Sequence, residues 1–331
     1  MIKEYAVDPN LEYTLDKLRF YVGQFGLDKG RLISRFPRQW KYILRENLQA
    51  PPKQKKRFEE ILSQLDDKVW DRKRQFTEGQ DWLVNAETDH MREPFAGIIT
   101  SDNPRGQSHV ILDEALDESH PLFGNNTDQR VQRDPRVMGN FLEPLFASAK
   151  WIKFIDPHFY PEPEDIRGVL KPNRWMYLFL GCLIRCSNRI DVDYHACRQQ
   201  TNRGKRAPSG QDEAADLKNW ERSCRGDFLK LLPKDRKIRV VRWQEIAFGK
   251  WFHARHIITD KAGIMIDPGL DCDWNTSGDT ALVKLITPQE RAEVLYEVAD
   301  ASTTFTRISE HEVIGTGEAF TEELRKGLTG A

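Results

Sequence analysis

The sequence predicts an α/β fold, in which a mixed or parallel sheet is flanked by helices and is preceded by a mainly helical N-terminal domain. Two observations lead to this expectation. Apolar residues recur at three- and four-residue steps in the first part of the chain, which is the spacing of amphipathic helices. Residues 151–194 then contain a short apolar strand, an apolar helix and a second strand, the succession that gives parallel strands.

The length of 331 residues allows two domains with sizeable cores. We expect a mainly helical domain with a small β element over residues 1–133 and the α/β domain over residues 134–315. The polar residues 316–331 are expected to form a C-terminal tail.

Three helices are expected in the first domain, over residues 11–25, 37–47 and 53–74, with a break at Pro51-Pro52. The last of them has charged flanks, which favour a solvated face over a nucleic-acid contact. Short strands are expected at residues 95–100 and 108–112, and the polar residues 113–134 are expected to connect the domains.

The second domain is expected to begin with a helix, because Asp134 can act as N-cap and Pro135 suits the first helical position. Capping also predicts a later helix, at the capping box from Thr287 to Glu290. The remaining elements are expected as strands over residues 151–155, 189–194, 237–243 and 281–286, and as helices over residues 174–186 and 217–231. The polar residues 198–216 are expected to form a mobile loop.

Composition narrows the functional classes. Lys and Arg number 50 against 51 Asp and Glu, so any basic surface must be local. No apolar run reaches the roughly 18 residues of a membrane span, and the start of the chain lacks the apolar core of a signal peptide. The five cysteines form no C-x-x-C pair, which favours reduced thiols in a cytoplasmic protein and argues against a zinc site. We expect no metal and no cofactor.

The chemistry-bearing stretch is Trp251-Phe-His-Ala-Arg-His-Ile-Ile-Thr-Asp260, in which His253, Arg255 and Asp260 follow the spacing H-x-R-x-x-x-x-D. The apolar residues predict a buried strand ending near Asp260, on which His253 and Arg255 face the same side. A guanidinium can hold phosphoryl oxygens, and an imidazole can attack phosphorus or move protons. We expect Asp260 to orient the imidazole, and these three residues to be catalytic.

This pattern resembles the H-x-K-x-x-x-x-D signature of the phospholipase D superfamily, with Arg255 in the usual lysine position. The resemblance extends to the helix, strand and Asp156-Pro-His-Phe turn upstream, and covers roughly residues 137–300. The family's later Gly-Ser-x-Asn is replaced here, at longer spacing, by Gly269-Leu270-Asp271. The resemblance implies a phospholipase D-like fold with one motif per chain.

The resemblance also implies a mechanism. One imidazole attacks phosphorus to give a phosphohistidine without any metal, and a second protonates the leaving oxygen and then activates water. With one motif per chain, the second imidazole would come from a homodimer that places two copies of His253 and Arg255 in one active site.

Four further residues are expected to support the site. Asp156 and His158 follow a strand at a proline turn, His195 ends the next strand, and Asp271 stands in the position of the family's asparagine. Ordinary structural roles stay open for each of them: turn-capping for Asp156, packing for His158, a turn for Asp271, and a satisfied surface histidine for His195.

The expected function is a nuclease or nucleic-acid phosphodiesterase, with prokaryotic anti-phage defence and its partner proteins as the setting. The basic segment with Arg198, Arg203, Lys205 and Arg206 is expected to bind the backbone of DNA or RNA. Two alternatives stay open. One is a catalytically inactive module of the same fold that binds phosphate, nucleic acid or a partner protein, and the other is a phospholipid phosphodiesterase.

Overall fold

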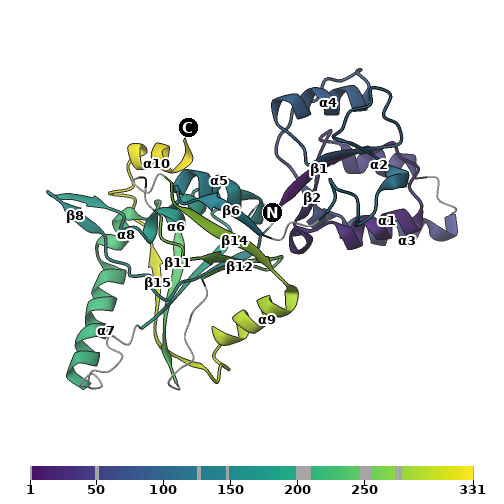
Figure 1. The fold of residues 1–331 in the computed structure, drawn as a ribbon. Coiled ribbons are helices and arrows are strands. Elements are labelled where there is room, and N and C mark those ends of the chain that lie inside the picture. The colour runs from purple at the N-terminus through teal and green to yellow at the C-terminus, as the bar shows by residue number, and fades with distance from the viewer. Residues whose placement is uncertain are drawn as a thin grey trace. The chain divides into compact units, whose positions relative to one another are not determined.

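The computed structural model of the chain describes residues 2–48, 52–124, 128–146, 149–198, 210–246, 255–272, 274 and 278–330. The chain forms two compact units, unit 1 over Met1–Thr127 and unit 2 over Asp128–Ala331 (Figure 1). The boundary lies earlier than the predicted one, because strand β6 (Asp128–Gln132) already pairs into the sheet of unit 2.

Unit 1 is built on a parallel sheet of five strands in the order β3-β2-β1-β4-β5. The prediction of a mainly helical domain with a small β element was therefore wrong. The first strand is almost completely buried, so it lacks the alternation of apolar and polar residues that would reveal a strand. The strands are β1 (Lys3–Val7), β2 (Arg31–Ser34), β3 (Val69–Trp70), β4 (Gly97–Thr100) and β5 (Val110–Leu112).

Helices cover both faces of this sheet. Tyr5 and Ile99 pack on one face in a cluster with residues of the first three helices, while Ala6 and Ile98 pack on the other face with residues of α4. Adjacent residues of a strand thus enter different cores. The helices are α1 (Leu15–Gln24), α2 (Trp40–Asn47), α3 (Pro52–Gln64) and α4 (Trp82–Arg92), and the 3-10 turns are η1 (Leu27–Lys29), η2 (Asp66–Lys68) and η3 (Asp113–Ala115).

The predicted helix over residues 53–74 is too long. Helix α3 ends at Gln64, and the chain continues through η2 into strand β3. Of the basic residues at the end of that predicted helix, Arg72 and Lys73 are exposed, but the side chain of Arg74 is only 1% exposed.

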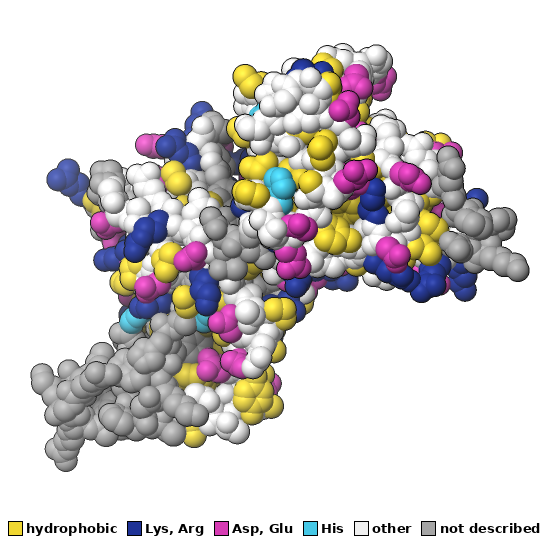
Figure 2. Space-filling view, turned by 45° about the vertical axis from the view of Figure 1, so that its right-hand side comes forward, with side chains coloured by type: hydrophobic (Ala, Val, Ile, Leu, Met, Phe, Trp, Pro, Cys, Tyr) yellow, Lys and Arg dark blue, Asp and Glu magenta, His cyan; other side chains and the backbone are white. Residues whose placement is uncertain are grey.

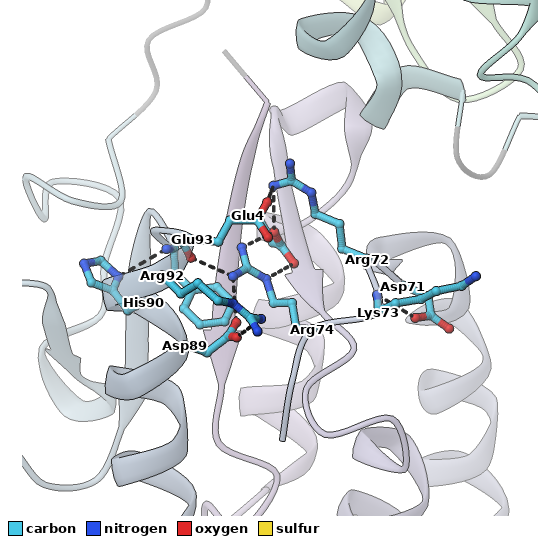
Figure 3. Close-up of polar contacts among 10 residues, drawn as sticks. Glu4, Asp71, Arg72, Lys73, Arg74, Asp89, His90, Arg92 and Glu93 are labelled. Carbon is cyan, nitrogen blue, oxygen red and sulfur yellow. Dashed lines mark hydrogen bonds and ion pairs between the residues drawn. The ribbon is translucent and has the colours of Figure 1, made fainter. Parts of the chain in front are cut away.

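Arg74 is the centre of a buried ionic network. Its guanidinium donates to both carboxylate oxygens of Glu4, at 3.0 and 2.6 Å, and to the carboxylate of Asp89 at 2.9 Å. It also lies over the ring of Phe95, 3.8 Å from the centroid. Figure 3 shows these contacts, with Arg72 and Arg92 reaching the same two carboxylates from outside. Arg74 thereby ties strand β1 to helix α4.

Replacing Arg74 by Met should destabilise unit 1 strongly, because the carboxylates of Glu4 and Asp89 would stay buried without their main partner. We expect a loss of about 3–5 kcal/mol in the free energy of unfolding, measured by urea denaturation. Arg45→Ala is the matched control, since Arg45 pairs with Glu59 at the surface and should cost at most about 1 kcal/mol. Equal losses in the two variants would contradict a structural role for the buried network.

Unit 2 contains a mixed sheet of eight strands in the order β15-β11-β10-β7-β12-β13-β14-β6. Strands β7, β10 and β11 are parallel to one another, and β12 runs antiparallel to β7. The α/β class with helices flanking a mixed sheet is thus confirmed. Besides β6, the strands are β7 (Trp151–Ile155), β10 (Asp191–Cys197), β11 (Lys237–Glu245), β12 (His256–Thr259), β13 (Gly263–Asp267), β14 (Thr280–Ile286) and β15 (Phe305–Ile314).

Each face of this sheet has its own core. On one face, Phe154 of β7 contacts the ring of Phe179 of α6, and on the other Ile155 packs with Val298 at the end of α9. Figure 1 shows α5, α6 and α10 above the sheet and α9 below it. The helices are α5 (Pro135–Phe146), α6 (Met176–Leu183), α7 (Gly210–Arg225), α8 (Asp227–Leu231), α9 (Pro288–Glu297) and α10 (Glu322–Thr329), and β8 (Glu164–Ile166) and β9 (Val169–Lys171) form a separate hairpin.

The expected C-terminal tail is a helix in the structure. Thr321 caps α10, and Leu328 of this helix is completely buried against α5 and α6. The capping box predicted for α9 is confirmed, with Thr287 and Glu290 exchanging hydrogen bonds. No helix in the described part of the chain is long and apolar enough to span a membrane.

Candidate functional site

The site forms where β7 ends and β12 begins. Because the two strands are antiparallel, His256 at the start of β12 pairs with Ile155 at the end of β7. Arg255 precedes His256 and Asp156 follows Ile155. These two residues therefore meet at the same end of the paired strands. They lie on the face that holds Phe154 and Ile257, since side chains alternate along a strand.

The carboxyl group of Asp156 is almost fully buried, with 1% of the residue exposed. Its Oδ1 accepts a hydrogen bond from the backbone N–H of His158 at 2.9 Å, whereas its Oδ2 has no hydrogen-bond partner among the described residues. Burial raises the pKa of Asp156 to about 6, against the opposing pull of the N–H of His158 and the charge of Arg255. This carboxyl group can therefore take up and release a proton near neutral pH.

Asp271 adds a permanent negative charge to the site. Its carboxylate pairs with Arg133 at 2.5 Å and with Arg174, and Arg133 also donates to its backbone oxygen. Burial alone would raise the pKa of Asp271, but the ion pairs with Arg174 and Arg133 lower it overall. At Gly269 a Cβ atom would lie 2.7 Å from this carboxylate and 3.6 Å from Nε of Arg255, so a side chain there would displace the carboxylate of Asp271.

His158 brings an imidazole to the same place. Burial and the nearby charge of Arg255 lower its pKa, while the charge of Asp271 acts in the opposite direction. The imidazole is therefore neutral at neutral pH and can accept a proton. We call this group of side chains the Arg255 cluster. It consists of Arg133, Asp156, His158, Arg174, Arg255 and Asp271.

Arg133 and Arg174 had no signal in the sequence. Arg133 lies between strand β6 and helix α5, and Arg174 lies just before helix α6, each without a motif around it. Both belong to the site because their guanidinium groups pair with the carboxylate of Asp271, which is far from them in the sequence. Their charges make the cluster suited to an anion such as a phosphate group.

Asp260 does not belong to this cluster. It follows the other end of the four-residue strand β12, and its Oδ1 accepts a hydrogen bond from the backbone N–H of Lys150, just before β7 begins. At about 3.3 Å per residue, the strand separates Asp260 from Arg255 by well over 10 Å. Asp260 therefore lies away from Arg255 and joins the opposite ends of the two strands, whereas His253, whose imidazole it is expected to orient, lies outside the described residues.

His195 lies on the other face of the sheet. It pairs in register with Ile155, the neighbour of Asp156, so its side chain points away from the Arg255 cluster. It is 2% exposed, and its Nδ1 accepts a hydrogen bond from Nε1 of Trp243 at 3.0 Å. Burial lowers its pKa. The expectation that His195 lines the same cleft was wrong, and the structure shows a core histidine.

The expected backbone-binding segment is only partly described. Arg198 forms ion pairs with Glu213 and Asp216, each at 3.2 Å, and its side chain is 11% exposed. The guanidinium of Arg198 is therefore held by carboxylates of α7. The prediction that it contacts a phosphate does not fit this arrangement. The catalytic residue expected in the motif, His253, lies outside the described residues, as do Arg203, Lys205 and Arg206.

Comparison with known proteins adds no family to this geometry. No known family model matches the sequence, and no curated protein matches it. Within the described residues, no group of three or more histidine, cysteine and acidic side chains could hold a metal ion.

The raised pKa of Asp156 should appear in the pH dependence of stability. The folded state keeps this proton to about pH 6, whereas the unfolded chain loses it near the ordinary value of 3.8. The group's stabilising contribution is thus complete below about pH 4 and is lost as the pH rises through 6. Asp156→Asn cannot ionise, so it should remove a decline on the order of 2–3 kcal/mol in unfolding free energy over this range.

Chemical denaturation at a series of pH values measures this effect. Asp191→Asn is a suitable control, because Asp191 is an exposed carboxyl group on β10 of the same sheet. A pH profile of Asp156→Asn that runs parallel to the wild type would contradict the assignment.

Proposed function

We propose that unit 2 is a phosphodiesterase of the phospholipase D type that cuts nucleic acid without a metal. The observation that supports this most directly is the position of Arg255, opposite a buried, titratable Asp156 at a sheet edge that also holds Arg133 and Arg174. His253 precedes Arg255 by two residues in the chain, which is the spacing that the resemblance requires.

The proposed reaction has two displacements at phosphorus. In the first, an imidazole nitrogen of His253 forms a bond to phosphorus, the bond to the leaving oxygen breaks, and that oxygen takes a proton. In the second, a water molecule attacks phosphorus, loses its proton to a base, and releases the imidazole. Arg255 balances the charge that builds up on the phosphoryl oxygens in both steps.

A second imidazole is needed to give and take the proton. The family resemblance assigns this role to His253 of a second copy of the chain, in a twofold dimer. The Arg255 cluster offers another group in the same chain, His158, whose lowered pKa keeps it neutral and ready to accept a proton. Mixing wild type with an inactive His253→Ala variant separates these routes, since only a shared site makes activity fall faster than the wild-type fraction.

Nucleic acid is the preferred substrate because basic residues follow strand β10 in the sequence. This strand is parallel to β7, so the segment that begins at Arg198 leaves the sheet at the edge where Asp156 lies. Arg203, Lys205 and Arg206 follow within that segment. Such positive charge favours a polyanion over a single phospholipid head group.

An inactive binding module is the second candidate. Arg255 stands in place of lysine, and the carboxylate of Asp271 stands in place of the family's asparagine amide and is taken up by Arg133 and Arg174. A site of this kind could hold a phosphate group of a nucleic acid or partner without cleaving it. Activity measurements on variants decide between the two.

His253→Ala should abolish cleavage of labelled DNA and RNA, measured with a chelator present, because the attacking imidazole is removed. The matched control is Asp260→Asn in the same motif, which should keep activity because Asp260 lies at the far end of β12. Full activity of His253→Ala after removal of contaminating nucleases, or a strict requirement for added Mg²⁺, would refute the proposed mechanism.

Arg255→Ala should lower the cleavage rate about 10²- to 10³-fold, since the charge that stabilises the transition state is lost. Arg255→Lys should retain substantial activity, although lysine cannot reproduce a bidentate contact. A wild-type protein that binds nucleic acid but shows no cleavage under any of these conditions would instead identify the binding module.

A further inference from the structure

We infer that a groove beside the Arg255 cluster binds an unpaired strand of nucleic acid, with a base on Trp274 and the backbone on nearby cations. This inference rests on the proposed function and names its substrate class. The groove, which we call the hairpin groove, has a volume of about 1080 Å³ and lies between the β8–β9 hairpin, the start of α5, and α10. Its residues used below are Arg136, Arg167, Lys171, Arg174, Tyr177 and Trp274.

The aromatic side of the groove is unusual for a soluble surface. The indole of Trp274 is 39% exposed, and its ring lies 4.5 Å from that of Tyr177 at an angle of 58°. Helix α10 supports it from behind, since a Cβ at Gly327 would lie 2.9 Å from the indole. A supported, partly exposed ring of this kind can stack on the face of any base, but the bases of a duplex are already stacked on each other.

The cationic side of the groove has unused charge. Arg136, Arg167 and Lys171 are exposed and form no ion pair with any residue in the described part of the chain. Arg167 stands at the tip of the β8–β9 hairpin, with φ of 57° ahead of Gly168 with φ of 80°, as in a tight two-residue turn. The hairpin therefore holds this charge away from the body of unit 2.

Acidic residues also line the groove. Asp134 accepts hydrogen bonds from the backbone N–H groups of Arg136 and Val137, each at 2.9 Å, and Glu164 stands opposite Lys171 in the hairpin without an ion pair between the two. The face drawn in Figure 2 likewise shows basic and acidic side chains interspersed, without one continuous basic surface. Recognition must therefore come from individually placed cations and from stacking.

The groove borders the proposed active site at Arg174. This residue lines the groove, and its guanidinium also pairs with Asp271 of the Arg255 cluster. An unpaired strand that crosses Arg174 would therefore reach from the Arg255 cluster into the groove that holds Trp274.

The test measures binding of labelled oligo-dT and oligo-U of about 15 nucleotides to the inactive His253→Ala chain, so that binding is separated from cleavage. Trp274→Ala should weaken binding about 5- to 100-fold, while Trp274→Phe should restore most of it. Arg167→Ala with Lys171→Ala should lower the slope of log affinity against log salt by about 0.7 for each lost contact. The exposed Lys237, outside the groove, supplies the control Lys237→Ala, which should change neither.

Each outcome is decisive for the groove. Unchanged affinity in Trp274→Ala and in the Arg167/Lys171 double variant would overturn the inference, even if the enzyme cleaves nucleic acid. Equal weakening for a duplex of the same sequence would overturn the unpaired strand, and competition by poly-glutamate with no effect of Trp274→Ala would indicate an acidic protein partner instead. Binding with these effects but no cleavage by the wild type would support the groove and refute the proposed function.

Discussion

The antiparallel pairing of β12 with β7 determines the geometry of the whole candidate site. It places the start of β12 against the end of β7, so that Arg255 and Asp156 meet where these two central strands end. Both strands lie in the middle of the sheet and are covered on both faces, which fixes these ends firmly. The same pairing buries Asp156, and this burial raises the pKa of its carboxyl group to about 6. A carboxyl group that would stay ionised at the surface thus becomes able to exchange a proton.

Much of unit 2 could be predicted from its sequence because its central elements carry strong local patterns. The apolar runs of β7, β11 and β14 and the capping box of α9 correspond closely to what the sequence indicates. Four of the strands that were missed are of two kinds. β1 and β2 are buried on both faces and show no alternation, whereas β6 and β15 are polar edge strands. The edge strands adopt β structure through pairing with a neighbour, which a local pattern cannot reveal.

The site was partly predictable for a related reason. Asp156, His158 and Arg255 lie at strand ends, and strand ends of an α/β sheet meet at a common edge. His195 was misplaced because a one-residue difference in register sends a side chain to the opposite face. Asp260 lies away from Arg255 because the strand that the sequence predicts between them, β12, separates the two ends of the motif. Arg133 and Arg174 depend on long-range folding and have no local signal.

The two outer strands of the unit 2 sheet have a consequence for how copies of this chain behave at high concentration. β15 is one edge of the sheet and carries Arg307, Glu310 and Glu312, while β6 forms the other edge and is exposed along most of its length. An open edge lined by charged and polar side chains is a poor template for the strand of another molecule, because pairing would bury or crowd those charges. The sheet is therefore protected against growing into fibrils by edge-to-edge addition. We therefore expect assemblies of this protein to form through side-chain surfaces and not by adding strands to this sheet.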